Sequence, residues 1–82
     1  MIKLTHAKYD NNFKVLLTFS DGQQAVFDGK DLLKREGPLL DTLRDEAYFK
    51  RVFIDAGALC WPNGLELSPL KLYDTLVLTE AA

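Results

Sequence analysis

The chain has 82 residues, of which 48% are hydrophobic and 27% charged, and its formal net charge at pH 7 is −2. A chain of this length encloses one hydrophobic core, so we expect a single domain over residues 1–82. The longest uncharged apolar runs fall far short of the roughly 20 residues that a transmembrane helix needs, which excludes a membrane span. Basic residues are scattered along this acidic chain, whereas nucleic-acid binders usually carry a basic stripe, so nucleic acid is disfavoured as a direct partner.

The first ten residues and the cysteine content bear on the compartment. The sequence MIKLTHAKYD carries charge almost at once and has no apolar segment of the kind that a secretory signal contains. The one cysteine, Cys60, cannot form an internal disulfide, which fits a reducing compartment. We therefore expect a cytoplasmic protein.

Residues 2–28 predict a three-stranded antiparallel meander. From Phe13 to Phe19 every second side chain is apolar, which places four of them on one face of a strand. Turn residues at positions 10–12 precede this strand. The Asp21-Gly22 pair follows it and is a strong hairpin signal, because glycine accepts a positive φ at no steric cost. Residues 24–28 supply the third strand.

The spacing of apolar residues becomes helical after a connection over residues 29–37, in which residues 31–34 can form one helical turn. We expect a middle helix from Pro38 to Asp45, because leucines recur there at helical spacing and proline is favoured at the first helical position. Residues 46–50 can extend this helix. Phe49 is expected to pack back onto the sheet.

Further short strands follow. Residues 51–55 are β-branched and aromatic, and residues 58–61 are apolar, which predicts two short strands joined by a tight bend at Ala56-Gly57. Pro62-Asn63-Gly64 predicts a turn, because proline fixes φ at the first central position and the next two residues tolerate positive φ. Residues 65–67 add one more extended piece.

Ser68-Pro69 predicts the start of a C-terminal helix, with serine as the N-cap and proline at the first helical position. We expect residues 79–82 to fray. The predicted fold class is therefore α+β: a three-stranded antiparallel meander, a middle helix, further short strands around a Trp-Pro-Asn-Gly turn, and a C-terminal helix. The predicted apolar side of that last helix comprises Leu70, Leu72, Tyr73, Leu76 and Val77.

Several motifs along the chain resemble those of the small bacterial family catalogued as domain of unknown function 2442. The resemblance implies an α+β domain, encoded beside a second small protein in arrangements that look like toxin–antitoxin pairs on mobile or plastic parts of bacterial genomes. Some members append a helix-turn-helix domain, which these residues do not include, so we do not expect DNA binding by that route. The motifs that carry the resemblance are Leu17-Thr18-Phe19-Ser20-Asp21-Gly22, Phe27-Asp28, Leu43-Arg44-Asp45, Phe49-Lys50-Arg51-Val52, Trp61-Pro62-Asn63-Gly64-Leu65-Glu66-Leu67-Ser68-Pro69 and Leu72-Tyr73.

The stretch from Gly57 to Pro69 holds the one tryptophan and the one cysteine. A tryptophan at the end of an apolar strand buries a large area, so the favoured interpretation makes Trp61 part of the core at a corner of the fold. The alternative places Trp61 and Tyr73 in an exposed aromatic patch that binds a partner, because both residue types are enriched at binding hot spots.

Catalysis is disfavoured, and no cofactor or metal is expected. Burial in an apolar stretch raises the pKa of a thiol, which makes Cys60 a poor nucleophile. His6 is the only histidine and lies on a distant strand, so nothing in the sequence pairs it with Cys60. One histidine and one cysteine also cannot supply the three or four ligands of a zinc site.

A protein-binding role remains. We expect a non-catalytic adaptor, antitoxin-like in character, that binds a cognate small protein from an adjacent gene or a second copy of itself. The acidic residues Asp41, Asp45 and Glu46 are expected to project from the middle helix toward a basic partner. Sheet edges at residues 4–9 or 52–55 could accept a partner strand. The alternative is a nucleic-acid-linked regulator with a local basic patch, built from Lys34, Arg35, Lys50 and Arg51.

Overall fold

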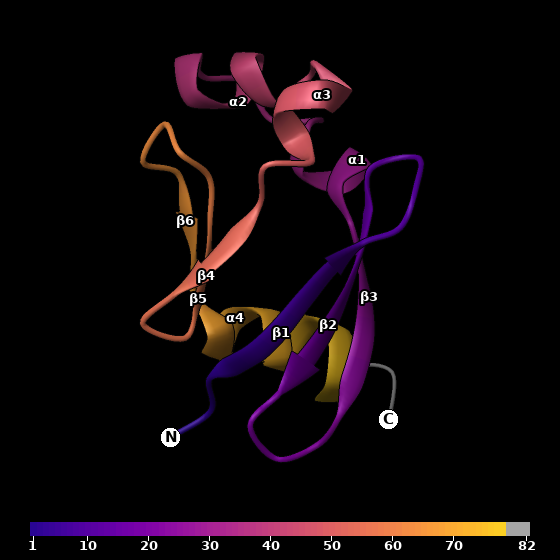
Figure 1. The fold of residues 1–82 in the computed structure, drawn as a ribbon, viewed down its shortest axis with the longest axis vertical. Helices are drawn as coiled ribbons and strands as arrows, with labels where there is room; N and C mark the ends of the chain where they lie inside the picture. Colours follow the sequence, from indigo (N-terminus) through magenta and orange to yellow (C-terminus); the bar gives the residue numbers. More distant parts are fainter. Residues whose placement is uncertain (79–82) are drawn as a thin grey trace.

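The computed structural model describes residues 1–78, which form two three-stranded antiparallel sheets with three short helices gathered at one end (Figure 1). This arrangement confirms the predicted α+β class. Residues 79–82, for which a frayed tail was expected, lie outside the described residues.

The first sheet is the predicted meander, in the order β1 (Leu4–Tyr9), β2 (Lys14–Phe19) and β3 (Gln24–Asp28). Alternate side chains of β2, from Val15 to Phe19, are buried as the apolar pattern predicts. Phe13 is not part of the strand, because its φ of 65° places it in the left-handed region within the turn. The predicted start of this strand is therefore wrong by one residue.

The second sheet has the order β4 (Phe53–Asp55), β5 (Ala58–Cys60) and β6 (Glu66–Leu67). The bend between β4 and β5 has positive φ at both central residues, 52° at Ala56 and 82° at Gly57. Two consecutive positive φ values match the right-handed twist of the flanking strands, which explains so short a connection.

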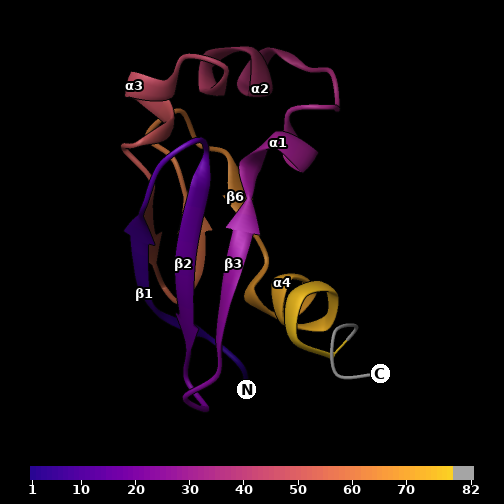
Figure 2. The same cartoon turned by 90° about the vertical axis from the view of Figure 1, so that its right-hand side faces the viewer.

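The two sheets lie side by side with their inner faces enclosing one core. In Figure 1 β1 runs next to β4 and β5, and in Figure 2 the second sheet lies behind the first. The backbone N–H of Leu4 donates to the carbonyl oxygen of Gly57 at 2.9 Å, which ties the start of β1 to the β4–β5 bend. The β1 edge and the β4–β5 hairpin thus face each other inside the molecule.

The predicted middle helix is two helices, α2 (Pro38–Leu43) and α3 (Glu46–Phe49), preceded by the short helix α1 (Gly29–Leu32). The break falls at Asp45, which has extended backbone and accepts a hydrogen bond from the N–H of Ala47 at 3.1 Å. An aspartate that caps a new helix in this way competes with continuation of the preceding one.

Phe49 packs into the core as expected, and its side chain is fully buried. Its ring centroid lies 5.1 Å from that of Phe13 and 5.4 Å from that of Trp61. Aromatic pairs at these separations contribute more than their buried area alone. Phe49 therefore links the helical end to both sheets.

The chain ends in α4 (Pro69–Tyr73), which continues as the π-helical turn η1 (Asp74–Leu78). Ser68 caps α4 as predicted, because its hydroxyl accepts a hydrogen bond from the backbone of the first turn at 3.4 Å. Leu72 is buried, but Leu70 is 57% exposed. The prediction that Leu70 belongs to the buried side is therefore wrong.

The turn after Trp61 gives the first testable prediction. Gly64 has a φ of 95°, and its N–H donates to the carbonyl oxygen of Trp61 at 3.0 Å. Replacing Gly64 with valine should lower the free energy of unfolding by more than about 1 kcal/mol, because a β-branched residue cannot adopt this backbone without strain. A thermal melt measures the effect, and an unchanged melting temperature would reject the turn geometry.

Candidate functional site

A groove opens between two parts of the molecule that are distant in the sequence. One side is formed by β3 and α1, and the other by β6, α4 and η1. Its volume is about 290 Å³. Its apolar lining is contributed by Phe27, Leu32, Leu67, Leu72 and Leu76.

The same groove carries charges of both signs. Leu32 and Leu72 of the groove lining are buried, whereas most of its charged side chains are exposed. The charges therefore form a rim around an apolar floor. A rim of this kind surrounds the apolar centre of many protein-binding surfaces. The charged residues of the rim are Asp28, Asp31, Arg35, Glu66 and Lys71.

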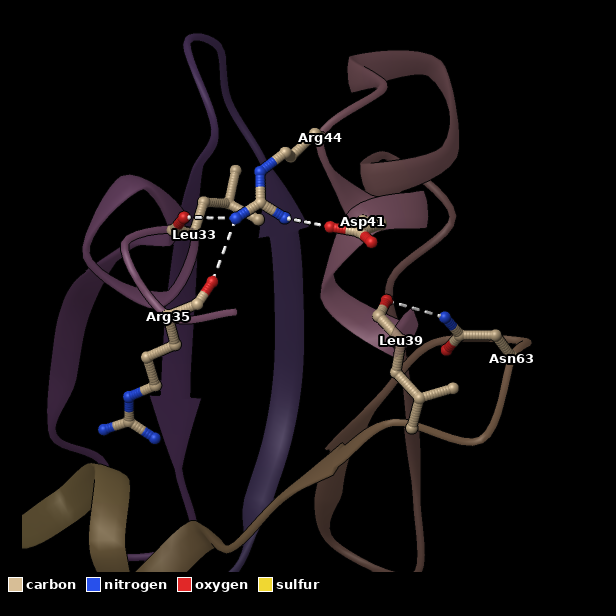
Figure 3. A network of polar contacts seen from close by, with 6 residues as sticks. All are labelled: Leu33, Arg35, Leu39, Asp41, Arg44 and Asn63. Atoms are coloured by element: carbon tan, nitrogen blue, oxygen red, sulfur yellow. Dashed lines mark hydrogen bonds and ion pairs between the residues drawn. The ribbon is translucent and has the colours of Figure 1, made fainter. Parts of the chain in front are cut away.

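Arg44 holds the loop that forms one wall of the groove (Figure 3). Its Nη2 donates to the carbonyl oxygens of Leu33 and Arg35, at 2.8 and 2.9 Å. Its Nη1 donates to Asp41 Oδ1 at 3.0 Å, which orients the guanidinium toward the loop. Asp41 therefore has a structural role: it orients Arg44, and Arg44 in turn holds the loop at the groove wall.

Asn63 fastens the Trp-Pro-Asn-Gly turn to the helical end. Its Nδ2 donates to the carbonyl oxygen of Leu39 at 3.0 Å, and its Oδ1 accepts from the N–H of Leu65 at 3.1 Å (Figure 3). Both ends of the side-chain amide are therefore used. The segment that the motif forms is a structural corner.

The three acidic residues predicted to bind a partner are exposed but occupied by internal contacts. Asp41 pairs with Arg44, and Asp45 caps α3. Glu46 accepts a hydrogen bond from the hydroxyl of Tyr9. None of the three lines the groove. Reversing all three charges would remove the Asp45 cap of α3. Such a variant would therefore lose stability, although the sequence suggests a change of surface charge alone.

Trp61 does not lie on the surface. Its side chain is 1% exposed, and Nε1 donates to the carbonyl oxygen of Phe49 at 3.0 Å. The alternative in which Trp61 forms an exposed patch with Tyr73 is thus wrong, and the interpretation of Trp61 as part of the core is confirmed. Trp61 packs within the hydrophobic core, where Phe49 is one of its neighbours.

Tyr73 is half-buried and joins α4 to the first sheet. Its ring packs edge-on against Phe19 at 5.1 Å, and its hydroxyl donates to Asp21. This hydrogen bond and one from the N–H of Gln23 lower the pKa of Asp21 below its ordinary value. Because the pKa is lowered in the folded state, this contribution to stability is present at neutral pH and is lost as the pH falls through the lowered pKa.

Cys60 and His6 do not form a pair in the part of the chain that the structure describes. Cys60 lies in the second sheet, where its thiol contacts the carbonyl oxygen of Ala58 at 3.7 Å. His6 is exposed on β1 beside Thr5. Burial raises the pKa of the Cys60 thiol, and the nearby Glu66 carboxylate raises it further.

The burial of Cys60 predicts its reactivity. A thiol reagent such as DTNB should label it slowly in the native protein and rapidly in denaturant, because the thiolate is both scarce and covered. Replacing Cys60 with alanine should lower stability and leave partner binding intact. Fast labelling of the native protein at neutral pH would instead show an accessible, activated thiol.

Residues 1–78 include neither a cluster of metal ligands nor a membrane-spanning helix. No three His, Cys, Asp or Glu side chains among them lie close enough to hold one metal ion together. None of the helices described there is long and apolar enough to cross a bilayer.

Comparison with known protein families identifies the family of this chain. A family model described as "Protein of unknown function (DUF2442)" matches residues 4–76, which include both sheets and the groove. The chain belongs to this family. The comparisons with curated proteins and with solved structures gave no match.

The four basic residues on which the regulator alternative was built do not lie together in this DUF2442 domain. Lys34 and Arg35 follow α1, whereas Lys50 and Arg51 follow α3. Figure 2 shows α1 and α3 on opposite sides of the helical end. The predicted basic patch, which needs both pairs on one face, is therefore not formed.

The sequence does not predict the groove of the DUF2442 domain. Its apolar residues belong to separate elements, where each fits a core position, and no local pattern in the terminal helix indicates that it approaches β3. The one hint of the groove in the sequence is Leu76, which extends the apolar side of the last helix toward the end of the chain and lines the groove in the structure.

Proposed function

We propose that this domain is a non-catalytic protein-binding module that acts on a cognate small protein encoded beside it, in the manner of an antitoxin. The observation that supports this most directly is the groove, which combines an apolar floor with a charged rim. Apolar centres surrounded by polar rims are typical of protein interfaces. The proposal extends to a bacterial setting through the family resemblance, and to the cytoplasm because the single cysteine fits a reducing compartment.

The size and charge of the groove indicate the kind of partner. Its volume is at the lower end of the range for small-molecule sites, about 300–1,000 Å³, and suits one or two inserted side chains better than a whole ligand. The net charge of −2 favours a basic partner, because complementary potentials raise the rate of association.

Isothermal titration calorimetry tests the proposal. The purified domain is titrated with the purified product of the neighbouring gene, and separately with a DNA duplex of mixed sequence, at two salt concentrations. We expect saturable binding to the protein and no binding to the duplex. Binding to the duplex alone, with a marked salt dependence, would replace this function with that of a nucleic-acid regulator.

Charge-reversal variants locate the interaction. Glu66→Lys changes the groove rim, and Asp10→Lys makes the same charge change in the remote β1–β2 turn. Both variants should slow association with a basic partner, because each makes the net charge of the domain less negative. Only the Glu66 variant should also speed dissociation, because it alone places a like charge at the contact.

A further inference from the structure

Two basic side chains line the groove from opposite walls. Arg35 follows α1 on one wall, and Lys71 belongs to α4 on the other. Figure 3 shows the Arg35 side chain extending from its loop toward the terminal helix, away from Arg44. Both residues are exposed, so neither charge is buried. The groove therefore has two positive charges beside one apolar floor.

Neither of these cations is neutralised by an ion pair within residues 1–78. The hydrogen bonds of both residues there involve main-chain atoms. The carbonyl oxygen of Arg35 accepts from Arg44 at 2.9 Å. The N–H of Lys71 donates to the Ser68 hydroxyl at 3.4 Å, and its carbonyl oxygen accepts from the Thr75 hydroxyl at 2.8 Å. The guanidinium and the ammonium group are therefore available to an anion that enters the groove.

The carboxylates of the rim leave most of this positive charge uncompensated. Asp28 accepts a hydrogen bond from the N–H of Lys30 at 3.0 Å and so caps α1. Asp31 pairs at 3.3 Å with Lys34, which is not part of the groove lining. Glu66 makes no ion pair in the described part of the chain. The rim thus offers two cations and one anion to a bound molecule.

We propose that the groove binds the C-terminal residue of the partner chain, with its apolar side chain on the floor and its carboxylate held by Arg35 and Lys71. The inference rests on the proposed function and specifies the part of the partner that is bound. Charge-assisted hydrogen bonds from arginine or lysine to a carboxylate are about twice as strong as neutral ones. Capture of a C-terminal carboxylate is a recurring mode of peptide recognition.

A chain terminus fits this groove better than an internal acidic residue does. The terminal residue carries an apolar side chain and a carboxylate together. In an extended internal segment, an acidic and an apolar side chain that are adjacent in sequence point to opposite sides, so one pocket cannot receive both. A basic residue shortly before the terminus would pair with Glu66, which agrees with the basic partner that the net charge of −2 favours.

A labelled peptide tests carboxylate binding without the whole partner. The probe is an eight-residue peptide with fluorescein at its N-terminus, ending in lysine, threonine and leucine with a free carboxylate. Fluorescence anisotropy with the full chain should show saturable binding. Amidating the C-terminus should weaken binding about tenfold, because the hydrogen bonds to the carboxylate are lost. Attraction by net charge alone predicts the opposite result, since the amide is the more basic peptide.

Two further peptides test the apolar floor and the position of the carboxylate. Glycine in place of the terminal leucine keeps the carboxylate but removes the inserted side chain, so binding should weaken about tenfold or more. Adding Gly-Ser-Gly-Ser after the leucine keeps both groups but separates them. This extended peptide should bind as weakly as the amide.

Variants of the domain test the two cations. Arg35→Gln and Lys71→Gln should each reduce the preference for the free carboxylate over the amide from about tenfold to about threefold or less. Lys8→Gln makes the same charge change on β1, outside the groove, and should leave the preference unchanged. Circular dichroism melts identify any variant that has not folded, and the peptide series gives its answer independently of the variants.

Each remaining outcome is decisive. No binding of the free-carboxylate peptide, or equal binding of its amide, would overturn the inference. Decanoate that displaces the labelled peptide as effectively as unlabelled peptide does would assign the groove to a small apolar anion, and would also overturn it.

The neighbouring gene's product separates the inference from the proposed function. Extending the C-terminus of that product by Gly-Ser-Gly-Ser should weaken its binding to the domain about tenfold. If the extended product binds as tightly as the natural one, the inference fails and the proposed function stands. If neither form binds, the proposed function fails, and the peptide series alone decides what the groove binds.

Discussion

Replacing Trp61 with alanine is expected to lower the free energy of unfolding by about 3–5 kcal/mol. The side chain is almost completely buried, packs against Phe49 at 5.4 Å between ring centroids, and donates a hydrogen bond to the Phe49 carbonyl. Domains have about 0.05–0.15 kcal/mol of stability per residue, so this loss approaches the stability of the whole domain. Urea denaturation followed by circular dichroism measures it.

Trp61→Phe separates packing from hydrogen bonding at the same position. This variant keeps an aromatic ring but leaves the Phe49 carbonyl without its donor, which should cost about 1–3 kcal/mol. The alanine variant should therefore be clearly the less stable of the two. Equal stability of Trp61→Ala and the wild type would show that Trp61 is not a core residue.

Gly29→Ala is expected to lower the free energy of unfolding by about 1–3 kcal/mol through overpacking. A Cβ atom at this position would lie 2.4 Å from Phe49 Cζ and 2.9 Å from the Phe13 carbonyl oxygen. The Phe49 ring cannot easily move, because it is fully buried between Phe13 and Trp61. Chemical denaturation measures the change.

A double-mutant cycle identifies the cause of this effect. In a Phe49→Leu background the ring is gone, so Gly29→Ala should cost less than in the wild type, although the contact with the Phe13 carbonyl remains. An identical cost in both backgrounds would mean that the Phe49 ring is not what excludes a side chain at Gly29.

Local signals were sufficient where neighbouring residues decide the structure. The Asp21-Gly22 hairpin, the turn at Gly64 and the Ser68 cap all formed as predicted, because each depends on backbone preferences within a few residues. The break before α3 was missed. Asp45 is compatible both with an exposed helix position and with an N-cap, and the choice depends on where α3 must direct Phe49.

The candidate site depends on contacts between distant segments, which the sequence does not specify. The predicted edges on β1 and β4 face each other inside the molecule, and α4 and η1 lie beside β3. The groove requires β3 and α1 to meet β6 and α4. Likewise, the role of Arg44 follows only from the approach of the Leu33–Arg35 loop to α2, shown in Figure 3.

Chemical-shift mapping by NMR tests most directly the claim that the groove binds a protein partner. The ¹⁵N-labelled domain is titrated with the unlabelled product of the neighbouring gene. We expect the largest amide shifts on Phe27, Leu32, Leu67 and Leu76, which line the groove, with small shifts at Asp41 and Glu46 on the helical end. Large shifts confined to α2 and α3, with the amides of β3 and α4 unchanged, would contradict this claim.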